Sequence, residues 1–144
     1  VCDISADCYF EELRQDFEGA YYGMYFLELA DYCTRENNDE REVLKLLYQS
    51  LRALTVKSIP RRLVRCIYEI RLIVANGEFP GLPQGNFSET ALYAVEFIAG
   101  TPVEKLYTFT LKEEVLAELV QIAEKYRRDF LPGEFHTLEI LETL

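Results

Sequence analysis

The sequence predicts an all-α fold, a compact bundle of roughly six to seven helices. Apolar residues recur every three to four positions over most of the chain, and no stretch keeps the strict alternation of a β-strand. Glycine, proline and capping signals divide the chain into segments of helical length. With 144 residues, 49% of them hydrophobic, the chain has the size and composition of one folded domain, so we expect residues 1–144 to form a single unit.

The first two predicted helices differ in how much of their circumference is apolar. Residues 9–17 carry apolar side chains at positions 9, 10, 13 and 17, which predicts a short amphipathic helix. Residues 20–33 are apolar around most of the helix, which predicts a central place in the core. One side of this helix holds three tyrosines that could stack on bases, Tyr21, Tyr25 and Tyr32. Within so apolar a segment, packing in the core is the favoured interpretation.

Start and stop signals bound the next two helices. Asp39 and Glu42 have the spacing of a capping box and precede an apolar stripe made of Val43, Leu47, Leu51 and Leu54. Pro60 predicts the start of the following helix, because proline is tolerated in a first turn. Asn76 and Gly77 predict its end. The glycines and prolines of residues 77–87 predict a loop.

Three further helices complete the predicted fold. Ser88 is placed to cap a helix that ends at the Gly-Thr-Pro sequence of residues 100–102. Thr110 and Glu113 have capping-box spacing, so a long helix is expected to open there and to close at residues 132–133. A short last helix is expected to carry Leu138, Ile140, Leu141 and Leu144.

Charge is distributed very unevenly along the chain. Residues 52–71 hold six of the fifteen basic residues and a single acid, Glu69, for a formal charge of +5, whereas the rest of the chain carries −15. On the predicted helix, one polar arc holds Arg61, Arg62, Arg65 and Glu69. A small basic patch on an acidic molecule suits a short acidic peptide better than a long duplex. The alternative is that these arginines pair with carboxylates elsewhere in the fold.

Arg71 breaks the pattern of this helix because it projects on the apolar side, near Val64. A lone buried charge is costly. We therefore expect Arg71 either to pair with a buried carboxylate, with Glu28 as the first candidate, or to line the rim of a pocket.

Signals for catalysis or metal binding are weak. His136 is the single histidine and has no nucleophile or acid arranged around it, so we expect no enzyme activity. Four widely spaced cysteines form no C-x-x-C pair, namely Cys2, Cys8, Cys33 and Cys66. The number and spacing of the cysteines predict reduced thiols in a cytoplasmic protein, with no metal and no cofactor. No apolar run reaches the ~18 residues of a membrane span.

Three segments, in this order, resemble a known family. The first joins Phe10-Glu-Glu-Leu-Arg14 to Tyr25-Phe-Leu-Glu-Leu-Ala-Asp31. The second joins residues 46–54 to residues 64–77, with their Tyr-Glu-Ile-Arg-Leu core, and the third runs from residues 106–126 to Phe135-His-Thr-Leu-Glu-Ile-Leu141. Together they resemble the C-terminal helical domain of RecO, the bacterial recombination mediator of DNA repair.

The chain departs from that family in three places. Nothing in it resembles the N-terminal OB-fold domain, and the chain begins at Val1, so we expect a piece of a longer protein. Pro-Gly-Leu-Pro-Gln-Gly at residues 80–85 replaces the four-cysteine zinc knuckle, so metal binding is not carried over. His136 and Thr137 stand where the family more often has a basic residue and serine.

The resemblance implies work with RecR in recombinational repair, remodelling of single-strand-binding protein and help in loading the recombinase. It implies that the helical domain receives the acidic, aromatic-ended tail of single-strand-binding protein. The residues placed to form that slot are Arg61, Arg62, Arg65, Tyr68 and Arg71. RecR binding is expected to need the absent OB-fold domain. The net charge of −10 predicts weak or no direct binding of DNA.

One alternative stays open beside this interpretation. The chain would be a purely structural helical domain whose basic helix pairs internally, while DNA and partner binding reside in an N-terminal part.

Overall fold

The computed structural model describes residues 17–35, 40–131 and 135–143. These residues form six α-helices and one short 3₁₀ helix, with no strand among them, so the all-α prediction is confirmed. The elements are α2 (Phe17–Arg35), α3 (Glu40–Ala53), α4 (Arg61–Ala75), α5 (Glu89–Gly100), η1 (Val103–Lys105), α6 (Glu113–Phe130) and α7 (His136–Thr143).

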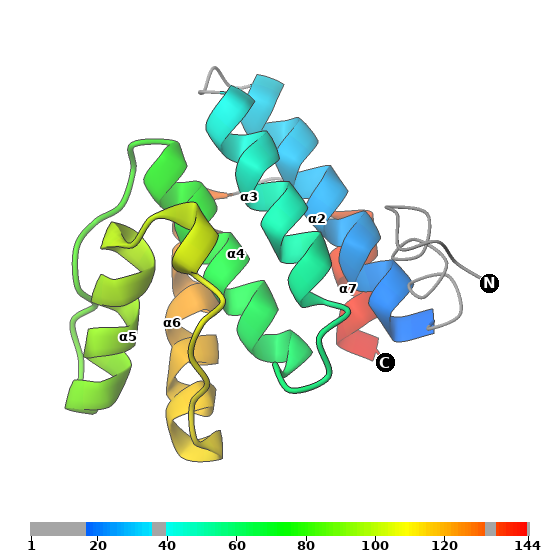
Figure 1. Ribbon diagram of the computed structural model, residues 1–144. Coiled ribbons are helices and arrows are strands. Elements are labelled where there is room, and N and C mark those ends of the chain that lie inside the picture. Colours follow the sequence, from blue (N-terminus) through cyan, green and yellow to red (C-terminus); the bar gives the residue numbers. More distant parts are fainter. Residues whose placement is uncertain (1–16, 36–39, 132–134, 144) are drawn as a thin grey trace.

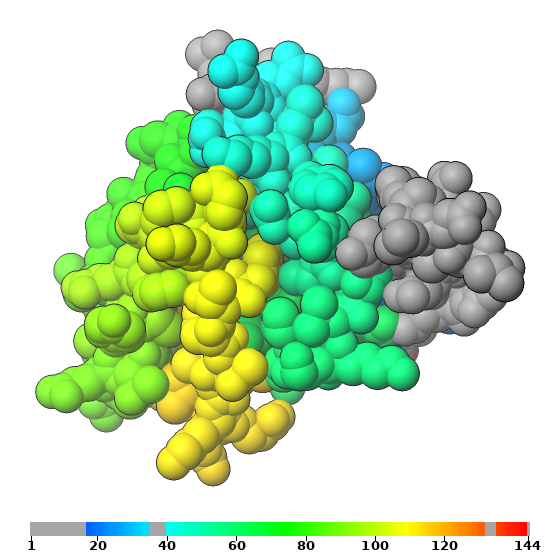
Figure 2. Space-filling view, in the orientation of Figure 1, coloured from blue at the N-terminus to red at the C-terminus, as the bar shows by residue number. Residues whose placement is uncertain are grey.

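Helix α4 lies in the middle of the bundle and contacts helices on both sides (Figure 1). On one side it packs against α3 and α2, and α2 in turn carries α7 on its flank. On the other side it packs against α5 and α6, which also pack on each other. The segment around η1, yellow in Figure 2, lies across the front between α5 and α3. This arrangement makes α4 the element from which a polar side chain can reach both halves.

The core is unusually rich in aromatic side chains. Tyr25 and Phe26 of α2 are fully buried, and Phe26 stacks on Tyr68 of α4 with 4.2 Å between the ring centroids. Tyr21 and Tyr32 are partly buried and pack against the same core. The tyrosines of α2 are therefore core residues, as their spacing predicted, and they do not form an exposed surface for stacking bases.

Several predicted helix ends are confirmed. Ser88 caps α5, because its hydroxyl accepts a hydrogen bond from the backbone N–H of Ala91. Helix α4 ends with a Schellman pattern, in which the N–H of Gly77 bonds to the carbonyl of Val74 and that of Glu78 to Ile73. Gly77 has a φ of 74°, a conformation that glycine adopts without strain.

The predicted capping box at Thr110 is wrong. Helix α6 begins at Glu113, and Lys112 occupies the N-cap position with no side-chain cap. Leu111 packs against the core as irregular chain, so the backbone enters the helix only after it. Glu113 and Glu114 then lie in the first turn, where their charge complements the helix dipole.

Three predictions fall on residues that the structure does not describe. The helix expected at residues 9–17 lies outside the described residues except for Phe17, where α2 starts. The Asp39 cap and the helix end at residues 132–133 also lie outside them.

Candidate functional site

The five residues predicted to form a peptide slot lie in different surroundings along α4. Tyr68 is 0% exposed, and its hydroxyl donates a hydrogen bond of 2.6 Å to the backbone carbonyl of Phe26. Burial raises the pKa of Tyr68 well above its usual range, so the phenol stays neutral. The assignment of Tyr68 to a surface slot is therefore wrong, because its ring is part of the aromatic core.

Arg71 binds backbone carbonyls and not a carboxylate. Its Nη1 donates to the carbonyl oxygens of Ile98 at 3.0 Å, Ala99 at 3.1 Å and Thr101 at 2.8 Å. These groups end α5 and carry the negative end of its dipole, so they stabilise a guanidinium. Glu28, the predicted partner, instead accepts hydrogen bonds from the N–H and hydroxyl of Thr137 at the start of α7. The predicted Arg71–Glu28 pair is wrong.

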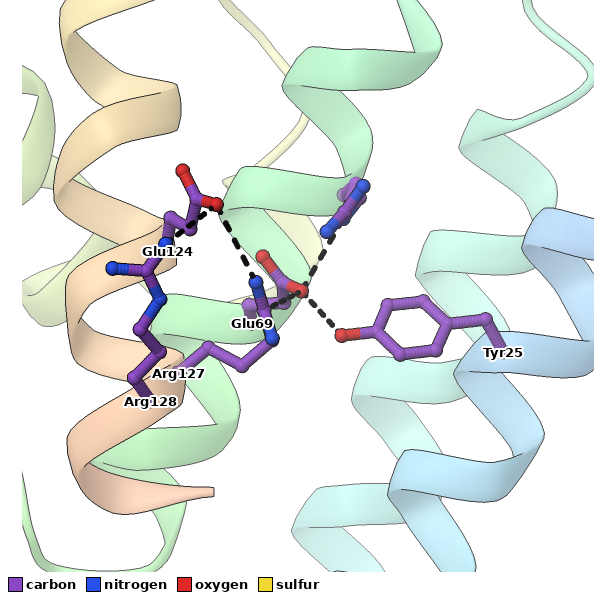
Figure 3. A network of polar contacts seen from close by, with 6 residues as sticks. Tyr25, Glu69, Glu124, Arg127 and Arg128 are labelled. Carbon is purple, nitrogen blue, oxygen red and sulfur yellow. Dashed lines mark hydrogen bonds and ion pairs between the residues drawn. The ribbon is translucent and has the colours of Figure 1, made fainter. Parts of the chain in front are cut away.

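Glu69 is the centre of a polar cluster that joins three helices (Figure 3). Its side chain is only 2% exposed, although the sequence placed it on a polar arc. Its Oε2 accepts a hydrogen bond from the Tyr25 hydroxyl of α2. The same oxygen lies 3.3 Å from Nε of Arg65 in α4 and 3.5 Å from Nε of Arg127 in α6. One buried carboxylate thus accepts hydrogen bonds from α2 and α4 and forms an ion pair with α6.

Electrostatics set the protonation states of Tyr25 and Arg65. Burial, reinforced by the charge of Glu69, raises the pKa of Tyr25 far above its usual range, so Tyr25 keeps its proton and donates a hydrogen bond to Glu69. Burial would lower the pKa of Arg65, but the attraction of Glu69 together with Tyr25 and Tyr22 outweighs it and the pKa is raised. Arg65 is therefore cationic and compensates the buried negative charge.

A second carboxylate lies next to this cluster on α6. Glu124 accepts from Nη2 of Arg128 at 3.0 Å and lies 3.9 Å from Nη2 of Arg127 (Figure 3). Arg127 therefore lies between Glu69 and Glu124. Its side chain is only 12% exposed, and its buried Nε has no hydrogen-bond partner within the described part of the chain.

A small pocket of about 120 Å³ opens beside the cluster, between α4, α6 and α7. It is lined by Arg62, Arg65, Cys66, Glu69, Val120, Glu124 and Glu142. Val120 and Cys66 give it an apolar wall, and burial raises the pKa of the Cys66 thiol so that it stays neutral. The structure thus brings Arg62 and Arg65 together at one pocket, as predicted for an arginine-edged slot, but with Cys66 and Val120 as apolar wall in place of Tyr68.

Sequence reasoning missed Arg127, although a signal for it existed. Leu119 and Ala123 are buried, and Arg127 continues their i, i+4, i+8 stripe on α6. An arginine on an apolar stripe indicates a buried partner, the argument that was applied to Arg71. The partner itself, Glu69, lies in another helix, 58 residues before Arg127, and has no local signal.

The other two basic residues of the predicted slot have carboxylate partners near solvent. Arg61 lies 3.6 Å from Glu18, and Arg62, whose side chain is 52% exposed, lies 3.5 Å from Glu113. Exposed pairs of this kind contribute little to stability. Together with the Arg65–Glu69 pair they are what the internal-pairing alternative expects.

A second, more open pocket of about 320 Å³ lies at the end of α3. It is lined by Gln49, Arg52, Ala53, Thr55, Val56, Ile59, Glu104 and Tyr107. It has one arginine, and the guanidinium of Arg52 lies 5.7 Å from the ring centroid of the exposed Tyr48. The carboxylate in its lining is Glu104, whose side chain is 50% exposed, in contrast to the buried Glu69 of the first pocket.

Within the described ranges, no group of three His, Cys, Asp or Glu side chains has the arrangement of a metal site. Cys33 and Cys66 are buried, while Cys2 and Cys8 lie outside the described residues. None of the helices described is long and apolar enough to cross a membrane.

The fold and the site together define a class: an all-helical domain whose polar groups converge on one buried carboxylate beside a small arginine-edged pocket. The family model described as recombination protein O C terminal matches residues 14–85, which is half of the chain, so the chain belongs to this family. This confirms the resemblance and gives the chain a RecO-like role in DNA recombination and repair.

The match covers only part of the resemblance noted above. Residues 106–141, the third segment, lie beyond the matched range, and the assignment of all 144 residues to one RecO-like domain stays a prediction. No match was found among curated proteins or among solved structures.

Proposed function

We propose that this chain is a non-enzymatic interaction domain of a RecO-like repair mediator, and that it docks the acidic tail of single-strand-binding protein. Family membership supports the repair pathway. The observation that carries the docking proposal is the pocket between α4 and α6, where Arg62 and Arg65 flank an apolar wall on an otherwise acidic molecule. A peptide that is both acidic and aromatic-ended needs those two features side by side.

The dimensions of the pocket fit one end of such a peptide. A volume of about 120 Å³ accommodates a single aromatic ring rather than an extended chain. The ring would pack on Val120 and Cys66, while the acidic residues before it would run past the half-exposed Arg62. Arg61, in the same first turn of α4, would add to the local positive charge.

RecR is a further proposed partner by family, and no surface of the described residues is assigned to it. In this proposal the protein acts in the cytoplasm and needs no cofactor.

The second candidate is a structural domain without a docking role. The specific observation in its favour is that Arg61, Arg62 and Arg65 each have a carboxylate within 4 Å in the fold. In this interpretation the basic stretch stabilises α4 among its neighbours, and partner binding resides elsewhere in a longer protein.

A binding experiment separates the two candidates. A fluorescently labelled acidic peptide ending in Phe is titrated with the wild-type chain, with Arg62→Glu and with the matched control Arg52→Glu, which alters the second pocket. We expect weak to moderate binding that weakens with salt, a loss of about tenfold or more for Arg62→Glu, and little change for Arg52→Glu. Wild-type affinity in Arg62→Glu would leave the structural candidate standing, and a loss confined to Arg52→Glu would move docking to the second pocket.

The variant Arg65→Glu is a poorer choice. It would place a second carboxylate against the buried Glu69, so loss of binding would be confounded by loss of stability.

A further inference from the structure

We infer that Tyr25 and Glu69 are positioning residues that hold the Arg65 guanidinium ready for the carboxylate group of a ligand, with the ligand's apolar side chain in the pocket formed by Val120 and Cys66. The identity of the natural ligand rests on the proposed function. The chemical class of ligand that the site accepts, a free carboxylate next to one apolar group, can be tested without knowing the natural ligand.

Arg65 is held on two sides. Its Nε donates to Oε2 of Glu69 at 3.3 Å, and its Cζ lies 5.5 Å from the centroid of the Tyr25 ring. A guanidinium carries five N–H donors. Only the Nε–H has an acceptor among the described residues, so the two terminal nitrogens, with four N–H groups, have none there. Arg65 lines the pocket and is 21% exposed, so a ligand can reach those nitrogens.

Glu69 is itself fixed in place. Tyr25 and Arg65 donate hydrogen bonds to its Oε2, and the Arg127 guanidinium forms an ion pair with the same oxygen, so the contacts come from three different helices. Tyr25 is fully buried and its ring packs edge-on against Phe135, with 6.1 Å between centroids. The anchor of Arg65 is therefore as rigid as the core. A side chain ordered before binding loses little further entropy when the ligand arrives.

The pocket specifies the chemical class of the ligand. Two terminal nitrogens of a planar guanidinium match the two oxygens of a carboxylate. The apolar wall beside them has room for about one aromatic ring. A C-terminal residue with an aromatic side chain combines a free carboxylate with an aromatic ring. N-acetylphenylalanine is a small probe that carries both groups.

The first experiment follows the Nε–H resonance of Arg65 by ¹⁵N NMR during titration with N-acetylphenylalanine or with its uncharged amide. We expect the acid to shift this resonance and to bind at least about fivefold more tightly than the amide. Equal effects of acid and amide, or no shift of the Arg65 resonance, would overturn the inference.

The second experiment tests positioning. Tyr25→Phe keeps the ring over Arg65 but removes the donor to Glu69, and Tyr21→Phe on the same helix is its matched control. We expect the Arg65 Nε–H to exchange faster with water in Tyr25→Phe and the acid to bind several-fold more weakly, with neither change in Tyr21→Phe. If Tyr25→Phe leaves both unchanged, the positioning role is wrong.

Arg65→Lys keeps the charge but loses the fork of donors, so it provides a check that does not depend on Tyr25. We expect this variant to bind N-acetylphenylalanine about tenfold more weakly. If Arg65→Lys binds N-acetylphenylalanine as tightly as the wild type does, the inference is wrong. The proposed function would still hold in that case, provided that the acidic peptide binds. Conversely, a wild-type chain that binds N-acetylphenylalanine through Arg65 but ignores the acidic peptide would sustain the inference and reject the proposed partner.

Discussion

At the scale of the residue, Glu69 shows how one buried carboxylate organises a site. It is compensated by Arg65 and Arg127 and by the neutral hydroxyl of Tyr25. Removing one charged partner of such a cluster lowers the free energy of unfolding by more than the intact cluster adds to it, because the remaining charges stay buried and poorly solvated. The site is therefore built on groups that the fold cannot easily lose.

Glu69→Ala should destabilise the fold by about 3 kcal/mol, since it leaves the guanidinium groups of Arg65 and Arg127 without their buried counter-charge. The free energy of unfolding, measured in urea, checks this. Glu139→Ala on the exposed surface of α7 is the control and should change it little. A loss below about 1 kcal/mol for Glu69→Ala would show that the cluster is not a structural centre.

Glu142 is the pocket residue whose charge opposes an acidic ligand, and it has no cationic partner among the described residues. Glu142→Gln should therefore strengthen binding of an acidic, Phe-ended peptide by about two- to fivefold, most clearly at low salt. The matched control is Glu139→Gln, on the same helix but outside the pocket. Weaker binding by Glu142→Gln would mean that this carboxylate assists the ligand or that the peptide docks elsewhere.

At the scale of the element, the helices are tied to each other by side chains that satisfy free helix ends. Arg71 of α4 binds the carbonyls that end α5, and Glu28 of α2 accepts from the N–H and hydroxyl of Thr137 in the first turn of α7. Glu118 of α6 accepts from the N–H and hydroxyl of Ser88 at the start of α5. Neighbouring helices thus supply the caps that a local sequence motif would otherwise provide.

Because Arg71 and Glu28 serve different helix ends, their contributions to stability should be independent. Arg71→Met should cost about 1–2 kcal/mol through the three carbonyls it leaves without a donor. Glu28→Gln should cost less, and the double variant should equal the sum of the two within about 0.5 kcal/mol. A double-mutant cycle by urea unfolding measures this. A coupling energy above about 1 kcal/mol would indicate the direct pair that the sequence first suggested.

At the scale of the whole molecule, the charge distribution sets which partners can approach. The net charge is −10. Three of the six basic side chains in residues 52–71, namely Arg61, Arg62 and Arg65, form ion pairs within the fold, with Glu18, Glu113 and Glu69 respectively. Long-range attraction for a polyanion is therefore absent, although a short peptide can still use one arginine-edged pocket.

This chain should accordingly bind single-stranded DNA poorly, with a dissociation constant well above ~1 µM at about physiological salt. Fluorescence anisotropy with a labelled oligonucleotide measures it, and the same preparation titrated with the acidic peptide shows whether the protein is competent. Sub-micromolar, salt-sensitive binding of the oligonucleotide would contradict the interpretation of the charge distribution.

Several features could be predicted from the sequence: the all-α class, the Ser88 cap, the end of α4 at Asn76 and Gly77, the burial of the tyrosines of α2 and membership of the RecO C-terminal family. These features depend on the period of apolar residues and on short capping patterns. Both operate within one helix or one turn, so they can be read from neighbouring residues.

The candidate site could not be predicted in full, because packing between helices forms it. The helical wheel placed Arg61, Arg62, Arg65 and Glu69 on one polar arc, yet Glu69 is buried because α2 and α6 cover that part of the helix. Tyr68 lies in the core and Arg71 lies at the end of α5, because their hydrogen-bond partners come from other helices. A helical wheel describes which residues share a face, but the neighbours that cover the face, and so the charge that each side chain meets, are set by packing between segments far apart in the chain.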